Sequence, residues 1–485
     1  PLRLVGSEMC IRDSSYRGPI QENGLPNIFN VFDLDDTKKR AEKVGWHDQT
    51  QSVFASVEVG WKQMLYLTAT GRNDWASQIA GSPSKSFFYP SVGLSWVPSS
   101  TWDLGNAFSY LKLRGSIASV GLPFPRFLTT PTYEYDATGK IWKDKTHYPI
   151  GDLKPERTIT YEVGIDARLW KNISLSASWY SADTKNQTFD PALPPSSSYT
   201  TIYLQTGHVR NTGVELSLGY SNQWRDFGWS SNFTFSWNKN EIVDLASGAL
   251  NPVTGQPLNL SELDIKGLGK AKYILKQGGT LGDLYTTSDL KFNDNGYVEV
   301  DKAGNLLLTD EGEQIYLGSV FPSENLAWRN DFRYKGINLG LLFTGRIGGI
   351  CYSATQANMD LYGVSEVSAA ARDAGGVLIN GREMVDAQKW YQAIGSQSGL
   401  PQYYTYSATN FRLQELSLGY TLPRKWFRNK MVLTVSFVGR NLWMIYCKAP
   451  FDPEAVASTG LSYQGIDYFM MPSLRSLGFN VKFEF

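Results

Sequence analysis

Apolar and polar residues alternate strictly in many segments of the chain beyond residue 50. In residues 173–179 every odd position is apolar, and residues 161–169 repeat the pattern with Glu162 and Asp166 at polar positions. Successive side chains of a β-strand point to opposite faces, so each segment has one apolar and one polar face. A helical stripe with a 3.6-residue period is expected only around residues 365–373. The pattern predicts an all-β protein.

The alternating segments are unusually long for β-strands. Most span about 10–14 residues, whereas a typical strand has about five or six. A strand tilted by about 45° needs roughly 9–11 residues to cross a bilayer. About fifteen strands are predicted: 52–61, 63–74, 87–97, 109–120, 157–170, 173–187, 209–222, 227–240, 270–277, 281–291, 324–335, 337–348, 408–421, 431–446 and 473–485.

The connections between these segments alternate in length. Short turns are expected at 61–63, 171–172, 335–336 and 422–430, and long loops at 121–156, 188–208, 241–269, 292–323, 349–407 and 447–472. Short periplasmic turns and long extracellular loops are typical of outer-membrane barrels. A soluble β-sandwich also alternates, because it buries one face of each sheet, but it would not keep so many connections short between long strands. The pattern therefore favours a transmembrane antiparallel β-barrel.

Composition agrees with a barrel and narrows the alternatives. The mean hydropathy is −0.29 and no run of 18 apolar residues occurs, which argues against transmembrane helices but not against membrane strands. The formal charge is zero, with 46 basic and 46 acidic residues, so electrostatic binding of nucleic acid is not expected. Aromatic residues near strand ends are expected to form interfacial girdles, namely Trp61, Tyr66, Trp96, Tyr110, Trp170, Trp237 and Trp443.

Candidate chemistry is sparse. The three cysteines and three histidines are far apart in sequence, and no metal-binding or nucleophile motif connects them. Residues 293–296 (NDNG) resemble part of a calcium loop, but Lys291 and Lys302 occupy the first and twelfth ligand positions, where carboxylates are needed. A hairpin turn at Asn295-Gly296 is therefore favoured over a metal site. We expect no cofactor, no metal and no enzymatic activity.

The chain is expected to contain two parts. Residues 1–50 form an N-terminal segment, and residues 51–485 form a partial barrel domain. The first ~15 residues resemble translated adapter sequence and carry no apolar signal-peptide core; the alternative is an ordinary polar tail. Single-chain bacterial barrels close with an even number of strands, so an odd count predicts that strands are missing at the front.

Eight short motifs in a fixed order give the chain a family resemblance over nearly all of residues 50–485. They are residues 52–56 (SVFAS), 65–75 (LYLTATGRNDW), 88–96 (FYPSVGLSW), 111–116 with 120–121 (LKLRGS, VG), 153–158 with 161–164 (LKPERT, YEVG), 211–216 (NTGVEL), 439–442 (GRNL) and 452–454 (DPE). In this order they resemble the SusC/RagA family of TonB-dependent transporters of Bacteroidetes.

This resemblance implies a barrel of about 22 strands, of which the chain would supply the C-terminal two-thirds. It implies TonB-dependent import of large nutrients across the outer membrane, most simply oligosaccharides. A SusD-like surface lipoprotein and the TonB–ExbB–ExbD complex would be the partners, the latter acting through a plug region that this chain lacks. Alternatives are uptake of peptides, siderophores or vitamins, a passive porin or structural barrel, and a secreted carbohydrate-binding β-sandwich.

Aromatic side chains in the predicted outer loops are the candidate substrate contacts. Such rings can stack on sugars in concave sites, although they can equally anchor a loop. The candidates are Trp142, Trp390, Tyr391, Tyr403 and Tyr404.

Overall fold

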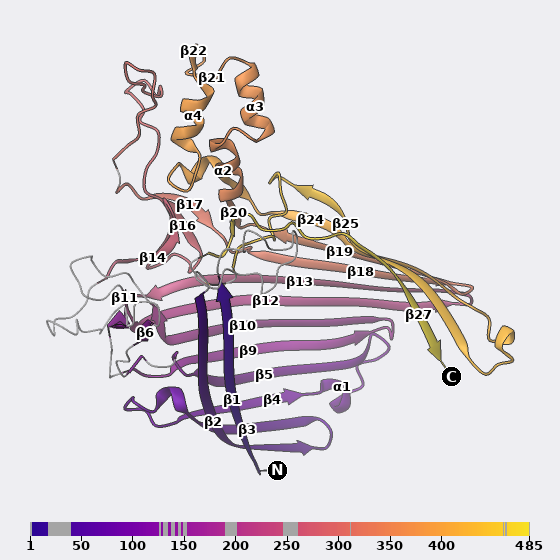
Figure 1. Cartoon of the computed structure of the whole chain (residues 1–485). Coiled ribbons are helices and arrows are strands. Elements are labelled where there is room, and N and C mark those ends of the chain that lie inside the picture. The colour runs from indigo at the N-terminus through magenta and orange to yellow at the C-terminus, as the bar shows by residue number, and fades with distance from the viewer. Residues whose placement is uncertain are drawn as a thin grey trace.

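One large antiparallel sheet dominates the computed structural model, and its strands follow one another in chain order (Figure 1). The structure describes residues 2–17, 40–125, 128–129, 134–136, 141–143, 147–148, 153–189, 201–245, 260–310, 312–458, 460 and 463–484. The sheet has 14 strands and is open, with the first and last as its edges. They are β1 (Leu2–Arg17), β2 (Arg40–Trp61), β3 (Leu65–Ala76), β4 (Phe87–Trp96), β5 (Phe108–Leu122), β9 (Glu156–Leu169), β10 (Ile173–Phe189), β12 (Leu204–Trp224), β13 (Phe227–Asp244), β18 (Glu324–Tyr334), β19 (Ile337–Ile347), β24 (Asn410–Thr421), β25 (Val432–Cys447) and β27 (Ser476–Glu484).

This architecture confirms the predicted all-β antiparallel fold and corrects two of its strands. The segments expected at 270–277 and 281–291 are not part of the large sheet. They contain β15 (Ala271–Lys276) and β16 (Asp283–Thr286), which are short and largely buried on both faces, in a separate four-stranded sheet. Thirteen of the fifteen expected strands thus lie in the large sheet, and β1, which was not expected, brings its number of strands to 14.

The start of the sheet also differs from expectation. The strand expected from residue 52 begins at Arg40, and it pairs along its outer part with β1. Pairing with β1 supplies hydrogen-bond partners for the backbone of β2, so the edge of the sheet lies at β1. The sheet therefore includes residues that precede the expected domain boundary at residue 51.

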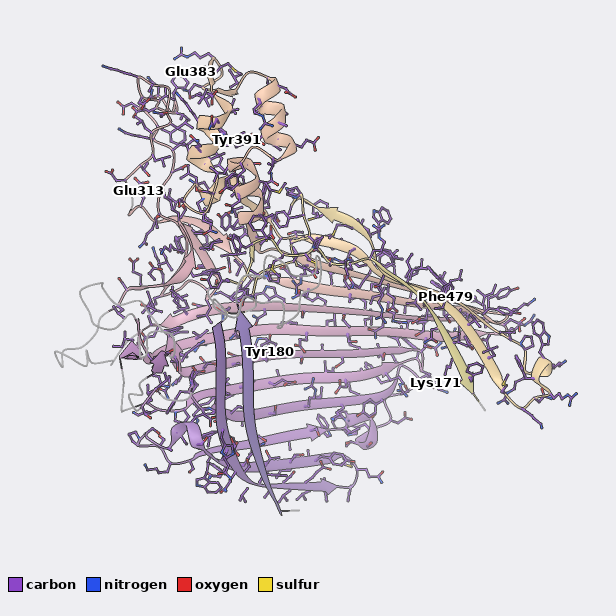
Figure 2. The ribbon with its side chains drawn as sticks, in the orientation of Figure 1. Lys171, Tyr180, Glu313, Glu383, Tyr391 and Phe479 are labelled. Atoms are coloured by element: carbon purple, nitrogen blue, oxygen red, sulfur yellow. The ribbon has the colours of Figure 1, made fainter. Side chains whose placement is uncertain are left out.

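The register of the strands places apolar residues of neighbouring strands beside one another on one face of the sheet and polar residues on the other face. Leu216 in β12 lies opposite Ala177 and Phe235 in the adjacent strands. The next residue, Ser217, lies opposite Thr234 on the other face. Side chains stand out from both faces of the sheet (Figure 2). One face is thus apolar and the other polar, as the sequence pattern predicts.

The short turns have the backbone that tight hairpins require. Lys62 and Gln63, and likewise Trp170 and Lys171, adopt positive φ angles of 46–67°. Two consecutive residues with positive φ match the right-handed twist of the flanking strands. Lys171 lies at the edge of the sheet where these turns gather (Figure 2). The short turns expected at 61–63 and 171–172 are confirmed.

Aromatic rings form a continuous group beside the turn between β12 and β13. Trp224 stacks on Phe227 with ring centroids 5.8 Å apart, and Trp229 stacks on Phe332 at 6.2 Å. Tyr220 contacts Trp229 at 5.1 Å. Such a group near strand ends is the girdle expected of a membrane barrel.

Most of the individually expected girdle residues are exposed, but Tyr66 and Tyr110 are not placed as expected. Trp61, Trp170 and Trp443 are about 60% exposed. Tyr66 lies opposite Gly60 and alternates with the exposed Leu65, so it belongs to the polar face. Tyr110 has the same strand parity as Lys112, which lies opposite Asp166 on the polar face. Strand parity decides this, because neighbouring side chains on a strand cannot share a face.

The long loops fold into a packed unit, here called the loop cap, at the opposite end of the sheet from the short turns (Figure 1). Its elements are β14 (Glu262–Leu268), β15, β16, β17 (Ile315–Ser319), β20 (Ile350–Ser353), α2 (Ala354–Leu361), α3 (Glu366–Asp373), β21 (Val377–Ile379), β22 (Glu383–Val385), α4 (Ala387–Ile394), η3 (Pro401–Tyr404), β23 (Thr405–Ser407) and β26 (Ile466–Asp467). One buried cluster joins Tyr273, Leu284, Tyr352, Ala357 and Ile466 from loops that are distant in sequence. The cap therefore has a hydrophobic core of its own.

The remaining elements are short. The helical stripe expected around 365–373 corresponds to α3, whose N-terminus is capped by the Ser365 side chain accepting from the Ser368 N–H at 3.0 Å. Among the described residues, no helix is long and apolar enough to cross a membrane. The other elements are η2 (Ser77–Ile79), α1 (Pro98–Thr101), β6 (Glu134–Asp136), β7 (Ile141–Lys143), β8 (His147–Tyr148), β11 (Thr201–Ile202) and η4 (Arg424–Phe427).

Substitutions to arginine should be tolerated on one face of the sheet only. We expect Leu216→Arg to impair assembly much more than Ser217→Arg, because a charge at a lipid-facing position near the bilayer midplane costs about 2–4 kcal/mol. Val163→Arg should behave like Leu216→Arg, since Val163 is 55% exposed on the apolar face. Folding yield in liposomes measures the effect.

Ser217 is a better control than Gly164, the residue after Val163. A Cβ atom at Gly164 would lie 2.8 Å from Nε of Arg114, so an arginine there would meet both crowding and like charge. Equal losses of folding yield for Leu216→Arg and Ser217→Arg would contradict the assignment of the two faces.

Candidate functional site

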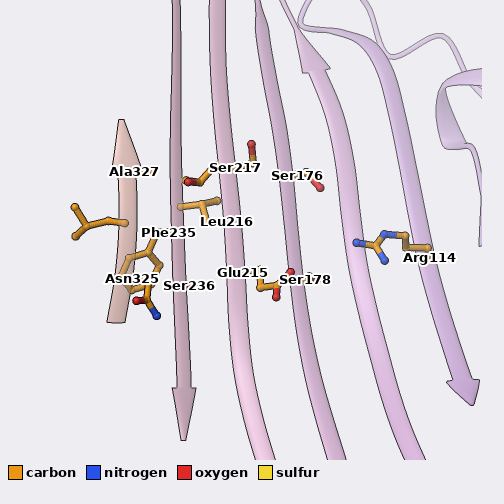
Figure 3. Close-up of a pocket in the computed structure, with 12 residues that line it drawn as sticks. Arg114, Ser176, Ser178, Glu215, Leu216, Ser217, Phe235, Ser236, Asn325 and Ala327 are labelled. Carbon is orange, nitrogen blue, oxygen red and sulfur yellow. The ribbon is translucent and has the colours of Figure 1, made fainter. Parts of the chain in front are cut away.

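The polar face of the large sheet, here called the inner wall, is lined by hydroxyl groups and charged side chains. A hollow of about 350 Å³ lies against it (Figure 3). Ser176 and Ser178 from β10, Ser217 from β12 and Arg114 from β5 line this hollow. Serine hydroxyls both donate and accept hydrogen bonds, so this surface can solvate a polar solute.

Charges on the inner wall are paired rather than free. Arg114 forms an ion pair with Glu162 and lies 3.6 Å from an oxygen of Asp166. The Ser176 hydroxyl donates to the same Asp166 at 2.7 Å. Opposite charges therefore lie side by side on this stretch of the wall, with two carboxylates around one guanidinium.

A second set of alternating charges crosses β18, β24 and β25. Arg329 contacts Asp331 at 2.9 Å and Glu415 at 3.6 Å, and Arg440 reaches the same Glu415 at 3.0 Å. Each of these pairs is partly exposed and contributes at most about 1 kcal/mol. They therefore contribute little to stability, and their main effect is to keep the inner wall polar with both signs of charge present.

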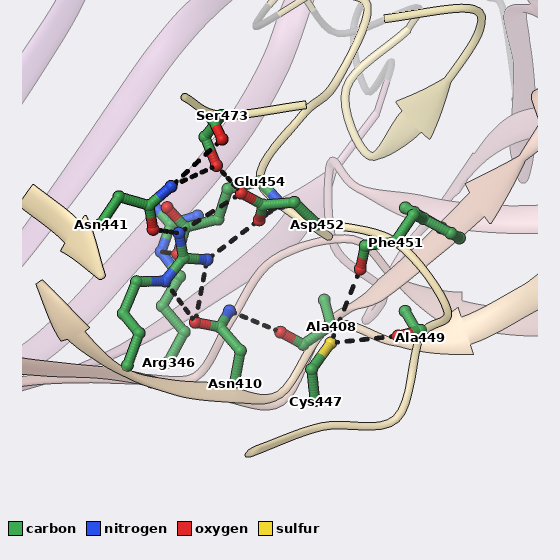
Figure 4. A network of polar contacts seen from close by, with 11 residues as sticks. Arg346, Ala408, Asn410, Asn441, Cys447, Ala449, Phe451, Asp452, Glu454 and Ser473 are labelled. Carbon is green, nitrogen blue, oxygen red and sulfur yellow. Dashed lines mark hydrogen bonds and ion pairs between the residues drawn. The ribbon is translucent and has the colours of Figure 1, made fainter. Parts of the chain in front are cut away.

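A buried arginine joins the large sheet to the last long loop. The side chain of Arg412 in β24 is 4% exposed, and its Nη2 lies 3.0 Å from Asp452 and 3.1 Å from Glu454 (Figure 4). Asn410 accepts from the same guanidinium at 3.2 Å, and Ser473 donates to Asp452. We call these five residues the Arg412 cluster. It ties both ends of the loop after β25 to the sheet.

Local irregularity in the strands makes room for this cluster. The ladder between β24 and β25 shifts register around Arg412, and Asn441 adopts a left-handed conformation with φ of 52°. Asn441 then donates from its side-chain amide to the Ser473 hydroxyl at 3.0 Å. A bulge of this kind re-aims side chains at the rim of a sheet. Two of the family-like motifs, residues 439–442 and 452–454, thus meet at one arginine.

The cluster sets the protonation of its central carboxylate. Burial by itself would raise the pKa of Asp452, but hydrogen bonds from Ser473 and Arg412 outweigh that effect and hold the pKa below its ordinary value. The carboxylate is therefore ionised at neutral pH and keeps its contact with Arg412.

The predicted aromatic contacts fall into different environments. Tyr391 and Tyr404 are 6% and 3% exposed and belong to the core of the loop cap. Trp390 and Tyr403 form an edge-to-face pair, with ring centroids 6.1 Å apart, and Tyr403 is 37% exposed. Trp142 lies in β7, and its side chain is outside what the structure describes. Substrate contact stays a prediction for all five residues.

The NDNG segment forms the turn that was expected of it. The Gly296 N–H donates to the Asn293 carbonyl at 2.9 Å, and Gly296 has a φ of 76°. The Asn293 side chain accepts from the Asn295 N–H at 3.0 Å, which is an Asx turn. The asparagine oxygen is thus used within the turn.

Sequence reasoning did not single out Arg412 or Asp360, which lies in α2. Arg412 sits in an alternating strand like any other polar residue, and its partners Asp452 and Glu454 lie 40 or more positions later. The only available signal was the recurrence of acidic and asparagine residues in the two motifs that converge on it. Asp360 lies in a long loop without a periodic pattern of its own.

The chain is similar in sequence to one family of known proteins. The sequence model of the family described as TonB dependent receptor-like, beta-barrel matches residues 12–442. TonB-dependent receptor P3 of Formosa agariphila is 24% identical over 467 residues, which cover 89% of this chain and 45% of that protein. TonB-dependent receptor SusC of Bacteroides thetaiotaomicron is 20% identical over 343 residues, covering 69% and 32%.

A solved structure shares the fold over almost the whole chain. The structure of the RagAB peptide importer in its open-open state matches with a TM-score of 0.69 at 17% identity, over 99% of this chain and 51% of that chain. The chain spans less than half the length of the curated relatives it matches.

Acidification should release the last long loop. The pKa of Asp452 is lower in the folded than in the unfolded state, so its stabilising effect is complete above the unfolded value of about 4 and is lost as the pH falls through the folded value. We expect protease cleavage within residues 447–475 to increase below about pH 4.

Removing the charge of Asp452 by substitution should have the same effect as acidification. Asp452→Asn should expose the loop at neutral pH and remove the pH dependence, while Asp294→Asn, in an exposed turn, should change neither. Removing one partner of a buried ion pair costs about 3–5 kcal/mol, and Glu454 as remaining partner places the expected loss at the lower end. An unchanged cleavage pattern for Asp452→Asn would contradict this role of the Arg412 cluster.

Proposed function

The chain belongs to the TonB-dependent receptor-like β-barrel family, and from this premise we propose that it is part of an active importer of large nutrients, with oligosaccharides as cargo. An outer-membrane location accompanies family membership. The observation that carries the proposal is the pair of faces of the large sheet. The apolar face suits lipid, and the inner wall is rich in hydroxyls and paired charges.

The chemistry of the inner wall supports a neutral, polar cargo. Arg329 and Arg440 are balanced by Asp331 and Glu415, whereas a path for a highly charged solute would be lined mainly by charge of the opposite sign. Neutral oligosaccharides are large and rich in hydroxyls, and they match a wall of serine, threonine and asparagine side chains. Peptide uptake is the competing proposal, because the RagAB protein that shares this fold is a peptide importer.

The proposed partners follow from the arrangement of the two ends. A SusD-like surface lipoprotein would seat on the loop cap, where Val364, Val367 and Leu378 are 59–68% exposed. Exposed apolar patches rimmed by polar residues suit protein partners. Coupling to the TonB–ExbB–ExbD complex would require a plug region, and the energy for uptake would enter there.

Obstruction of the inner wall should reduce uptake. We expect Ser217→Trp to lower oligosaccharide uptake severalfold, because the indole would enter the hollow along the wall. Leu218→Trp is the matched control, since Leu218 is 44% exposed on the apolar face and a tryptophan there meets lipid. Uptake of labelled neutral oligosaccharides by cells that express the receptor from its complete gene measures the effect.

The same assay separates the competing functions. Uptake that stops when TonB is deleted supports active import, and uptake that continues indicates a passive porin. Competition by tripeptides but not by oligosaccharides would assign the importer to peptides. Equal uptake by both tryptophan variants would contradict the role of the inner wall.

A further inference from the structure

A small hollow in the loop cap, separate from the inner wall, combines groups suited to a ligand. It has a volume of about 220 Å³ and lies among α2, α3 and α4. Asp360 in α2, Arg372 in α3, and Gln388 and Tyr391 in α4 line it, together with Tyr362 just after α2. The three helices stand at the end of the cap away from the large sheet, and Tyr391 lies among them (Figures 1 and 2).

The buried position of the Asp360 carboxylate is energetically unfavourable. It is 4% exposed, and within the described part of the chain no basic side chain forms an ion pair with it. Its carboxylate accepts a hydrogen bond from the Gln356 side-chain amide at 2.9 Å, and the buried Tyr404 hydroxyl also interacts with it. It also lies in the last turn of α2, where the helix dipole disfavours a negative charge. Burial of a charge without a partner destabilises a fold, so a ligand is a natural explanation for it.

Arg372 supplies the complementary donors. One guanidinium nitrogen donates to the Gly363 carbonyl at 2.6 Å, which fixes the side chain between α3 and the turn after α2. That contact uses one of five N–H donors, and it is the only hydrogen bond of this side chain in the described part of the chain. Gln388 adds an amide that both donates and accepts.

Two tyrosine rings complete the site. Tyr362 is 76% exposed at the hollow, whereas Tyr391 is buried beside it. Burial, followed by the nearby Asp360 carboxylate, raises the pKa of Tyr391, so its hydroxyl keeps its proton and can donate. Aromatic rings pack well against apolar C–H surfaces.

We propose that this hollow is a subsite for one neutral sugar ring of the cargo, with Asp360 accepting from ring hydroxyls and Arg372 donating to them. A pyranose offers adjacent hydroxyls that each donate and accept, and a C–H face that stacks on Tyr362 or Tyr391. The opposite charges of Asp360 and Arg372 balance, which favours a neutral ligand over an anion or a cation. The inference rests on the proposed oligosaccharide cargo and adds to it a site at the cap.

The variant Asp360→Asn distinguishes a ligand-binding role of Asp360 from a structural one, because the two roles predict different changes in melting temperature. Asp360→Asn keeps the acceptor for Gln356 but removes the unpaired buried charge. A ligand-binding role therefore predicts weaker sugar binding together with an unchanged or higher melting temperature. A structural role predicts that binding and melting temperature fall together.

The test uses the receptor expressed from its complete gene. A glycan array first identifies the neutral oligosaccharide that the wild type binds most tightly, and calorimetry then measures its affinity for the variants. We expect Asp360→Asn and Arg372→Gln each to weaken binding at least tenfold. Glu366→Gln, which removes an exposed charge from the first turn of α3, should leave affinity unchanged.

The possible failures are distinguishable. If the wild type binds no neutral glycan, the proposed cargo is wrong and the subsite falls with it. If the wild type binds one and Asp360→Asn retains that affinity with its stability intact, the subsite alone is wrong. A parallel loss of affinity and melting temperature assigns Asp360 to structure and also overturns the subsite. Binding of triglycine that is lost in Asp360→Asn would assign the hollow to a peptide terminus instead.

Discussion

The structure depends on one uninterrupted antiparallel hydrogen-bond ladder through fourteen strands. Lipid offers no hydrogen-bond partner to a backbone N–H or C=O group, so a membrane sheet must satisfy these groups itself. Strict alternation is the consequence, because each strand faces lipid on one side and the inner wall on the other. The tight turns with paired positive φ values, such as Lys62-Gln63, keep this ladder continuous at the short-turn end.

Charged side chains have different surroundings on the inner wall and in the loop cap. On the inner wall, arginines lie beside carboxylates, as in Arg329 with Asp331, and the surface stays polar with little net field. At the rim, the Arg412 cluster uses the same chemistry in a buried setting to hold a loop in place. Asp360 in the loop cap is the exception, since it is buried and no basic side chain in the described part of the chain pairs with it, and this contrast supports the binding role proposed for it.

The loop cap is a folded unit and not a set of independent loops. Its core takes Tyr273 from one long loop, Tyr352 from the next and Ile466 from the last, so each loop is ordered by the others. Asn380 reinforces this arrangement across loops by pairing with both backbone groups of Val298, at 2.8 and 3.0 Å. A rigid cap can hold a small site such as the hollow around Asp360 in one geometry, which lowers the entropic cost of binding.

The sequence by itself determined the fold class, the two faces and thirteen of the fourteen strands of the large sheet, because strand periodicity is a local property that lipid on one side enforces residue by residue. The same reasoning mistook β15 and β16 for membrane strands, since a short apolar run does not reveal whether lipid or protein covers it. Only the tertiary structure brought Asp452 to Arg412, buried Tyr391 and Tyr404, and enclosed Asp360 among three helices. These contacts join positions far apart along the chain, and packing of the loop cap, which has no sequence period, decides them.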